Sequence, residues 1–283
     1  MRLNGDRRWL RLLAIAAMAV LVFAACGEDE DETPAGGATD EGPQFETLEE
    51  GVLQVGSCLE YEPFEYREGG ELKGFDVELT EAIAGELALE VKWVKANFDT
   101  IFTAVAGGQF DMVAAASTIT PERDQEVDFS DPYFNARQGL SANTSETPDI
   151  QSTDDLGDGD VVGVQKGTTG KAWAEDNLVA QGVELRTYDA IPDAFTDLEA
   201  GNLVAIVNDE PSSVAEVANR QGLEVVQGID TGEVYGLAFS PDNPELTEAV
   251  NQALADLITD GTYASIFETY FPGQEIPPEY QPS

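Results

Sequence analysis

The sequence predicts an α/β fold built from two similar halves. Residues 52–116 show strand and helix patterns in alternation, and the same alternation starts again near residue 160. Strands that are joined through helices pair in parallel by right-handed crossovers, which gives a sheet covered by helices. The chain has 283 residues. Once its N-terminal segments are set aside, this is enough for one large domain or two small ones.

The first half contains three predicted strands and two predicted helices. Apolar and polar residues alternate over 52–56, and residues 90–94 form a second strand pattern. Leucine and isoleucine recur every four residues between 77 and 88, which predicts an amphipathic helix. A second helix covers 98–105 and ends at a pair of glycines. The largely apolar segment 110–116 is typical of a buried parallel strand.

The second half repeats this order. Residues 160–164 predict a strand, which is followed by Gly-Thr-Thr-Gly and a helix that carries Ala172, Trp173 and Leu178. The remaining elements are a strand over 185–188, a helix over 192–200, strands over 204–207 and 223–226, a long helix over 246–257 and a final helix over 263–270. Two successive strand–helix–strand units therefore predict two similar lobes.

The N-terminus has the pattern of a targeting segment. Arginines at positions 2, 7, 8 and 11 precede an apolar run over 12–25, which suits a signal-peptide core and is too short for a comfortable bilayer span. The run ends in Val-Phe-Ala-Ala-Cys, which resembles a bacterial lipobox with phenylalanine in place of the usual leucine. We expect a signal peptide over 1–25, lipid attachment at Cys26, and an acidic, disordered tether over 26–45 that has too few apolar residues to fold.

The composition excludes several classes of function. The chain carries 55 Asp and Glu against 14 Lys and Arg, a formal net charge of −41, which disfavours nucleic acid as a partner. It contains no histidine, which removes Ser-His and Cys-His catalytic pairs and the commonest zinc ligand. Of the two cysteines, Cys58 stands alone once Cys26 carries a lipid. We expect no internal disulfide, no metal and no cofactor.

Residues with binding chemistry follow four of the predicted strands. In open α/β sheets, ligands bind at the carboxyl ends of the strands. The residues at these ends are Tyr61 after the first strand, Thr118 and Arg123 after the third, Thr168 and Thr169 after the fourth, and Asp209 after the sixth. Four loops of this kind predict a shared ligand site.

Arg123 is the most informative of these residues. It lies just inside a predicted helix start, beside two threonines, where its guanidinium offers a planar fork of donors to a carboxylate. The alternative is that an arginine in a Thr-Pro-Glu-Arg helix start is only a solvated side chain.

The chain resembles the family 3 extracellular solute-binding proteins, the polar amino acid receptors of ABC importers. The resemblance runs from about residue 51 to residue 272 and appears in seven segments in register. These are Gly-Val-Leu-Gln-Val-Gly, Tyr-Glu-Pro-Phe-Glu-Tyr, Leu-Lys-Gly-Phe-Asp-Val-Glu-Leu, Ser-Thr-Ile-Thr-Pro-Glu-Arg, Gly-Thr-Thr-Gly, Asn-Asp-Glu-Pro and Asp-Gly-Thr-Tyr.

The resemblance implies a periplasmic-binding-protein-like fold of type II. Each lobe would be an α/β sandwich with a mainly parallel sheet, and two crossover strands near 138–141 and 234–237 would join the lobes. Lobe 1 would comprise 46–138 and 238–275, lobe 2 would comprise 139–237, and 276–283 would form a C-terminal tail. The ligand would be enclosed when the lobes close.

The resemblance also implies roles for the residues at the strand ends. Arg123 would bind the ligand's α-carboxylate, helped by the hydroxyl and amide of Thr118 and the amide of Thr169, in the loop that also holds Thr168. Asp209 would receive the α-ammonium group; it also suits the N-cap of a helix that starts near residue 211, and both roles can hold together.

Four further residues complete the implied site. Tyr61 and Phe98 would stack on the ligand's side chain, although ordinary core packing is the alternative. Cys58 stands where many family members carry an acidic residue, which disfavours a lysine or arginine receptor; a buried small hydrophobe is its alternative role. Ala116 stands where a hydroxyl or glycine is common, which leaves a backbone contact at that position. Glutamine, histidine, cystine and small neutral amino acids remain unranked as ligands.

The expected protein is therefore a lipid-anchored, extracytoplasmic and monomeric receptor on the bacterial cell membrane. It would bind a free amino acid and deliver it to the transmembrane subunits of an ABC permease, and it would not be an enzyme. The alternative is an enzyme that resembles the cyclohexadienyl dehydratases, which act on prephenate or arogenate on the same fold. Glu60 or Glu210 would then supply the acid, and Lys166 is the nearest candidate for a second cation.

Overall fold

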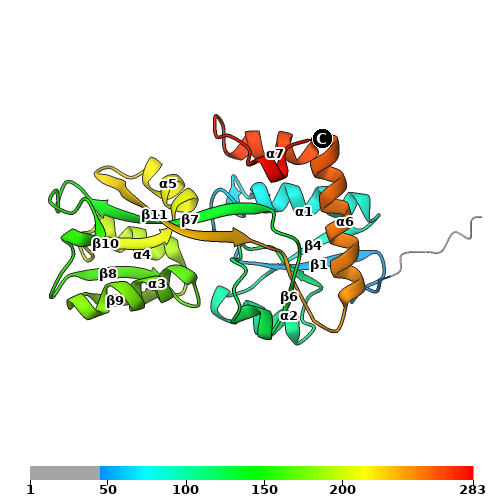
Figure 1. The fold of residues 1–283 in the computed structure, drawn as a ribbon, viewed down its shortest axis with the longest axis horizontal. Coiled ribbons are helices and arrows are strands. Elements are labelled where there is room, and N and C mark those ends of the chain that lie inside the picture. Colours follow the sequence, from blue (N-terminus) through cyan, green and yellow to red (C-terminus); the bar gives the residue numbers. More distant parts are fainter. Residues whose placement is uncertain (1–44, 283) are drawn as a thin grey trace, which may run out of the picture. The chain divides into compact units, whose positions relative to one another are not determined.

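Two five-stranded sheets, each flanked by helices, organise residues 45–282, the part of the chain that this computed structural model describes (Figure 1). Within the described residues, both sheets belong to a single compact unit. The predicted signal peptide, Cys26 and residues 26–44 of the predicted tether lie outside the described residues. Within residues 45–282, no helix has both the length and the apolar character that crossing a bilayer requires.

The first sheet consists, in spatial order, of β4 (Glu90–Lys95), β1 (Val52–Ser57), β5 (Met112–Val113), β12 (Ala238–Phe239) and β6 (Asp128–Phe129). Strand β1 pairs in parallel with β4 and with β5, whereas β12 runs antiparallel to both β5 and β6. It follows that β6 has the direction of β1, so that β12 alone runs against the other strands.

The second sheet has the same layout. Its spatial order is β9 (Glu184–Tyr188), β8 (Val161–Gln165), β10 (Ala205–Asp209), β7 (Phe134–Asn143) and β11 (Leu223–Tyr235). Strand β8 pairs in parallel with β9 and β10, and β7 runs antiparallel to both β10 and β11. Here β7 alone runs against the others. The two mainly parallel sheets confirm the predicted α/β class and the repetition in the two halves.

Helices cover both sheets. Those that pack with the first sheet are α1 (Phe75–Glu86), α2 (Ile101–Ala106) and α6 (Pro244–Asp260), and those that pack with the second are α3 (Thr169–Asn177), α4 (Ile191–Glu199) and α5 (Glu210–Ala218). Helix α7 (Thr262–Tyr270) packs on α1 and α6. Gly261 separates α6 from α7 because it adopts the left-handed φ of 87° that favours glycine. The short elements are the hairpin β2 (Tyr66–Glu68) and β3 (Glu71–Lys73), and the 3-10 helices η1 (Phe98–Thr100), η2 (Arg123–Gln125), η3 (Thr153–Asp155), η4 (Val179–Gln181) and η5 (Pro278–Tyr280).

Two long strands, β7 and β11, connect the two halves. Figure 1 shows them side by side between the two groups of elements, and they pair antiparallel from Phe134 and Tyr235 onward. Tyr235 also forms a bridge with Thr118 on the first-sheet side. The chain therefore passes from β6 through β7 into the second sheet and returns through β11 to β12.

Two predicted local structures near the strand ends are wrong. The segment 110–116 is a strand only over Met112–Val113, and its extended backbone ends at Ala116, which adopts a left-handed φ of 46°. Arg123 does not start an α-helix. It begins the single 3-10 turn η2, because the chain returns to the first sheet at β6 immediately afterwards.

An aromatic cluster fixes the loop that follows β1. Phe64, from that loop, lies 5.1 Å from Phe134 and 5.4 Å from Tyr235, as measured between ring centroids. Phe271, after α7, lies 4.9 Å from Phe134, and all four side chains are buried. Large aromatic side chains contribute heavily to core stability. The loop that carries Tyr61 is therefore held against both crossover strands and the C-terminal helix.

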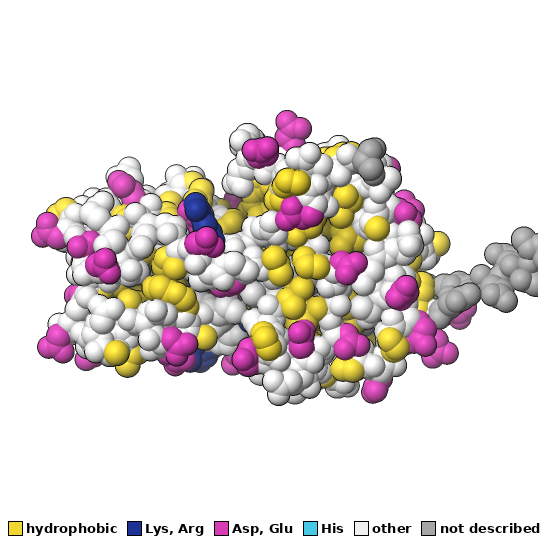
Figure 2. All heavy atoms as spheres, in the orientation of Figure 1, with side chains coloured by type: hydrophobic (Ala, Val, Ile, Leu, Met, Phe, Trp, Pro, Cys, Tyr) yellow, Lys and Arg dark blue, Asp and Glu magenta, His cyan; other side chains and the backbone are white. Residues whose placement is uncertain are grey.

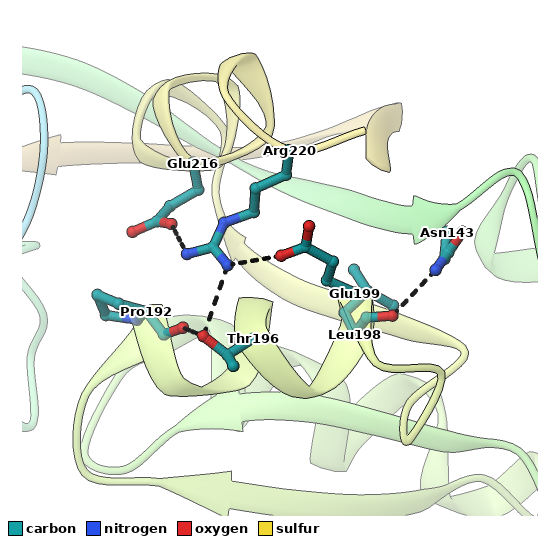
Figure 3. Close-up of polar contacts among 7 residues, drawn as sticks. All are labelled: Asn143, Pro192, Thr196, Leu198, Glu199, Glu216 and Arg220. Atoms are coloured by element: carbon teal, nitrogen blue, oxygen red, sulfur yellow. Dashed lines mark hydrogen bonds and ion pairs between the residues drawn. The ribbon is translucent and has the colours of Figure 1, made fainter. Parts of the chain in front are cut away.

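Arg220 ties together two helices of the second half (Figure 3). Its guanidinium donates to Glu216 of α5 at 2.8 Å and to Glu199 of α4 at 3.4 Å. At the same end of α4, the side-chain amide of Asn143 donates to the carbonyl of Leu198 at 3.1 Å, which joins α4 to β7. These contacts position α4 and α5 on the second sheet.

The surface reflects the acidic composition. Figure 2 shows one face, on which Asp and Glu side chains are spread widely and the Lys and Arg side chains are few and separated. The formal net charge of the whole chain is −41. This face therefore offers a polyanion no basic patch to bind.

Candidate ligand-binding site

The residues predicted to bind ligand lie around one cavity between the two sheets. The first-sheet side contributes the loop after β1, the start of η1 and the segment after β5, and the second-sheet side contributes the ends of β8 and β10 and the start of α3. The cavity volume is about 20 Å³, well below the roughly 300–1,000 Å³ of small-molecule sites, because side chains of the two sides contact each other across it. The lining residues are Cys58, Tyr61, Glu65, Phe98, Ala115, Ala116, Thr118, Arg123, Gln165, Thr168, Thr169 and Asp209.

Arg123 is held over the cavity by contacts with both halves. Its Nη1 donates to the carbonyl of Thr118 at 2.6 Å, and its Nη2 donates to the carbonyl of Gly167, on the second-sheet side, at 3.0 Å. The guanidinium lies over the rings of Phe98 and Phe102, 5.2 and 4.5 Å from their centroids. Burial lowers the pKa of Arg123 to about 10, so the group remains charged at neutral pH. The side chain is thus positioned and not freely solvated.

Asp209 faces the cavity from the end of β10. It accepts a hydrogen bond from Tyr61 Oη at 2.6 Å and another from Gln138 Nε2. Burial, and then the nearby Glu233, raises the pKa of Asp209 to about 6, against the effect of those hydrogen bonds. Although Asp209 occupies the N-cap position of α5, its side chain makes no capping hydrogen bond. Its carboxylate is therefore directed to the cavity and not to the helix.

Glu233 is a site residue that the sequence analysis missed. One oxygen of its carboxylate accepts hydrogen bonds from Thr118 Oγ1 at 2.7 Å and Thr169 Oγ1 at 2.8 Å, and Gln138 Nε2 lies 3.2 Å from the other oxygen. The residue lies on β11 opposite Ala136 of β7. The sequence signal that could have identified Glu233 was its position next to 234–237, the segment predicted to cross between the lobes.

Three other predicted residues combine cavity lining with structural contacts. Thr168 accepts a hydrogen bond from the amide of Lys171 at 3.1 Å, so its hydroxyl caps α3. Phe98 packs edge-to-face with Phe102, with centroids 5.7 Å apart. Tyr61 stacks with a core phenylalanine while its hydroxyl points to Asp209. Tyr61 and Phe98 therefore pack against core side chains and also line the cavity.

Cys58 and Ala116 offer no charge to a ligand. Cys58 is buried, and burial raises the pKa of its thiol well above its usual value, so the group is neutral. The backbone N–H of Ala116 donates to Asp76 Oδ2 at 2.8 Å. The amide at this position is thus already engaged within the protein.

Glu65 is the second site residue that the sequence analysis missed. It lines the cavity, its side chain is fully buried, and neither carboxyl oxygen has a hydrogen-bond partner among the described residues. Burial, with Asp76 and Asp209 nearby, raises its pKa well above the usual range. The residue lies in the segment Tyr-Glu-Pro-Phe-Glu-Tyr, where a carboxylate among aromatic residues was the available signal.

The cavity as a whole combines one guanidinium with several carboxyl groups. Arg123 is the only cation among the lining residues. Asp209 and Glu65 also line the cavity, and Glu233 accepts hydrogen bonds from two threonine hydroxyls of the lining. Such a set suits a small molecule that carries one carboxylate and more than one hydrogen-bond donor. Among residues 45–282, no group of three or more acidic or cysteine side chains is arranged to hold a metal ion.

Comparison with known proteins agrees with this arrangement. Residues 53–273 match the bacterial extracellular solute-binding proteins, family 3. The L-cystine-binding protein TcyJ of Escherichia coli (strain K12) is 34% identical over 239 residues, which cover 82% of this chain and 87% of that protein.

Solved structures show the same fold. An ancestral arginine-binding protein bound to arginine has a TM-score of 0.75 and 38% identity, covering 78% of this chain and 98% of that chain. An ancestral amino acid-binding protein described as a precursor of cyclohexadienyl dehydratase has a TM-score of 0.71 and 35% identity, covering 78% of this chain and 95% of that chain. These likenesses confirm the two-lobe fold of type II.

Proposed function

Because this chain belongs to the bacterial extracellular solute-binding proteins of family 3, we propose that it captures a free amino acid and delivers it to an ABC importer. The ligand occupies the cavity between the two sheets, and the permease subunits of the importer recognise the protein with its ligand enclosed. The relatives that bind arginine or cystine support an amino acid as the ligand.

One observation carries this proposal: opposite charges face one cavity from opposite sheets. Arg123 belongs to the first-sheet side and Asp209 ends β10 of the second sheet. The carboxylate and ammonium groups of an α-amino acid match this pair. Hydrogen bonds to charged groups contribute about 1.5–3 kcal/mol each, and a micromolar dissociation constant corresponds to roughly 8 kcal/mol. A few such bonds reach that value after the costs of association.

Closure of the lobes follows from the contacts that already cross the cavity. Arg123 donates to the carbonyl of Gly167, and Tyr61 donates to Asp209. A ligand that contacts both lobes makes its full set of contacts only when the lobes are closed. It therefore binds the closed form more tightly than the open form and shifts the open–closed equilibrium toward the closed form. The permease then distinguishes the liganded protein by its closed shape.

We assign lobe 1 to residues 46–138 and 238–275, lobe 2 to 139–237, and a C-terminal tail to 276–283. Sheet membership supports this division, since β1, β4, β5, β6 and β12 share one sheet while β8, β9 and β10 share the other. The crossovers β7 and β11 link the two lobes, and the C-terminal helices α6 and α7 belong to lobe 1.

The protein is anchored outside the cytoplasm by lipid at Cys26, as a monomer on an acidic tether. The lipobox-like sequence before Cys26 supports the anchor. Expression of the full chain and of Cys26→Ser in bacteria tests it: we expect the protein in the membrane fraction and the variant in the soluble fraction. Equal membrane association of both contradicts lipid attachment at this residue.

A dehydratase is the second candidate, because one structural relative is a precursor of such an enzyme. Glu60 and Glu210, the acids considered from the sequence, instead pair with Lys95 and Arg137 and do not line the cavity. Lys166 pairs with Asp189 and also lies outside the lining. The cavity therefore has no second cation for a second carboxylate, which favours binding over elimination. A gain of aromatic absorbance on incubation with prephenate would reverse this preference.

A thermal-shift screen of the purified chain against the twenty amino acids and cystine tests the proposed function. A ligand that binds the native state raises the melting temperature by mass action. We expect at least one amino acid to raise it by several degrees, with calorimetry confirming one site per chain. No shift with any of them contradicts the proposal.

A further inference from the structure

A second concave site lies between the two halves of the molecule. We call it the α5–α7 groove, because its walls are α5 from the second half and, from the first half, the segment 62–63 and the end of α7 with the residues that follow it. Residues 134–137 of β7 also line it, and Figure 1 shows α5 and α7 on the same side of that strand. The groove shares no lining residue with the cavity that holds Arg123 and Asp209. Its volume is about 830 Å³, within the roughly 300–1,000 Å³ of small-molecule sites.

Apolar side chains line much of the α5–α7 groove. Val214 of α5 is 53% exposed, and it is one of only three large hydrophobic side chains that the described part of the chain exposes. Pro63 and Pro272 of the first half line the same groove, together with Pro211 and Ala215 of α5. Because Val214 lies in a concave site and not on an open surface, a ligand can cover it and bury apolar area.

The charged side chains of the groove leave an excess of negative charge. Both carboxylate oxygens of Glu210 accept hydrogen bonds from the guanidinium of Arg137, so these two residues are neutral as a pair. Glu62 and Asp230 also line the groove, and neither forms a salt bridge within residues 45–282. The groove therefore has three carboxylates and one guanidinium, and that guanidinium is already engaged.

Glu62 has only carboxylates as its charged neighbours. Partial burial, and then the charges of Glu216 on α5 and Glu68 on β2, raise the pKa of Glu62, and no cation of residues 45–282 lowers it. Glu62 belongs to the first half and Glu216 to the second, so two like charges repel each other across the boundary between the halves. A positive charge beside Glu62 would remove this repulsion.

We propose that the α5–α7 groove is a second ligand site, which binds a small organic cation with an apolar body, such as an arylalkylammonium ion. The ammonium group pairs with Glu62, and the apolar body packs against Val214 and Pro211. A metal ion would gain nothing from the apolar walls, and an anion would meet the excess of carboxylates. Because the groove is separate from the cavity, this inference does not depend on the proposed function.

The acidity of the whole chain does not account for this combination. Figure 2 shows carboxylates spread over the visible face, and a carboxylate on an open surface is ordinarily solvated. The groove differs because an unpaired carboxylate and an exposed apolar side chain line one concave site. The ligand is therefore expected to need both its charge and its apolar body.

Three related compounds test this requirement. Phenethylammonium has the ring and the charge, phenethyl alcohol keeps the ring without the charge, and ethylammonium keeps the charge without the ring. Calorimetric titration of the purified chain in about 0.15 M salt screens the general attraction of cations to an acidic protein. We expect a dissociation constant of about 1 mM or lower for phenethylammonium and at least about tenfold weaker binding of the other two. No binding of phenethylammonium, or equal binding of phenethyl alcohol or ethylammonium, overturns the proposal.

Matched variants test whether the compound binds in the groove. Val214→Arg places a guanidinium on the apolar wall, and Val179→Arg makes the same change on η4, at a side chain that is 49% exposed and outside the groove. Both positions are exposed, so both variants should keep the wild-type melting temperature within a few degrees. Val214→Arg should weaken phenethylammonium binding at least about tenfold, and Val179→Arg should change it less than about twofold. Equal weakening by both variants shows only a general attraction of charge and overturns the site.

The ammonium position is tested at Glu62. In Glu62→Gln, the preference for phenethylammonium over phenethyl alcohol should fall at least about threefold, whereas Glu71→Gln, at an exposed position of β3 outside the groove, should keep it. An unchanged preference in Glu62→Gln overturns the pairing with Glu62.

A final measurement separates the groove from the amino acid cavity. Phenethylammonium should bind when the chain is saturated with the amino acid that gives the largest thermal shift, and displacement by that amino acid overturns the second site. The comparison of Val214→Arg with Val179→Arg needs no bound amino acid. A failure of the proposed function is therefore distinguishable from a failure of this inference.

Discussion

Replacing Glu233 with alanine is expected to strengthen amino acid binding. One oxygen of Glu233 accepts hydrogen bonds from Thr118 at 2.7 Å and from Thr169 at 2.8 Å. The resemblance to the family assigns the hydroxyl of Thr118 and the amide of Thr169 to the carboxylate of the ligand. The Glu233 carboxylate occupies that Thr118 hydroxyl and the hydroxyl of Thr169, so a ligand has to displace it before it binds.

The size of the effect follows from those two contacts. Hydrogen bonds to a charged acceptor contribute about 1.5–3 kcal/mol each. Glu233 is only partly buried, so water replaces much of this when the carboxylate is displaced, and about 1–2 kcal/mol of competition remains. Its removal should lower the dissociation constant by about 5- to 30-fold.

Titration calorimetry at pH 7.5 measures this change with the amino acid that gives the largest thermal shift. Glu224→Ala is the matched control, because it removes the same charge from the same strand at an exposed position outside the cavity lining. We expect its affinity to stay within twofold of the wild-type value. Weaker binding by Glu233→Ala, or a change no larger than that of the control, refutes the competition.

Two further predictions concern stability, measured as the free energy of unfolding in urea. Burial raises the pKa of Asp76 and Asp209 to about 6 in the folded protein, above the value of about 3.9 in an unfolded chain. The folded state therefore holds these two protons more tightly than the unfolded chain does. This proton binding contributes fully to the free energy of unfolding below about pH 4, and the contribution is lost as pH rises to about 6. We expect greater stability at pH 5 than at pH 7.5, and a smaller difference in Asp76→Asn; equal stability at both pH values contradicts this reasoning. A Cβ atom at Gly56 would lie 2.4 Å from the ring of Phe110, so Gly56→Ala should cost about 1–3 kcal/mol. Gly85→Ala, in α1 with no atom within 4 Å, should instead gain about 0.5–1 kcal/mol, and a similar effect of both changes would show that the packing at Gly56 is not tight.

The sequence was sufficient to predict which residues gather at the cavity. Parallel strands end at the same edge of a sheet, so Tyr61, Thr118 and Asp209 were predictable neighbours once their strands were identified. The structure places them on one cavity. Their roles in binding remain predictions.

The sequence was not sufficient where tertiary packing decides the local structure. Ala116 ends its strand early because it adopts a left-handed φ, and its amide donates to the buried Asp76. No local sequence pattern predicts such a long-range contact. Glu65 and Glu233 were missed for a related reason. A glutamate in a turn or in an edge strand is usually solvated, and only the packing of the aromatic cluster and of the crossover strands turns these two toward the cavity.

The central claim is that Arg123 binds the carboxylate of an amino acid, and calorimetry on Arg123→Ala tests it most directly. Removing one partner of a buried charge pair costs about 3–5 kcal/mol, so the dissociation constant should rise at least 100-fold. The melting temperature without ligand should change by only a few degrees. Arg67→Ala, an exposed arginine of the β2–β3 hairpin, should bind like the wild-type chain. Affinity in Arg123→Ala within threefold of the wild-type value would contradict the account.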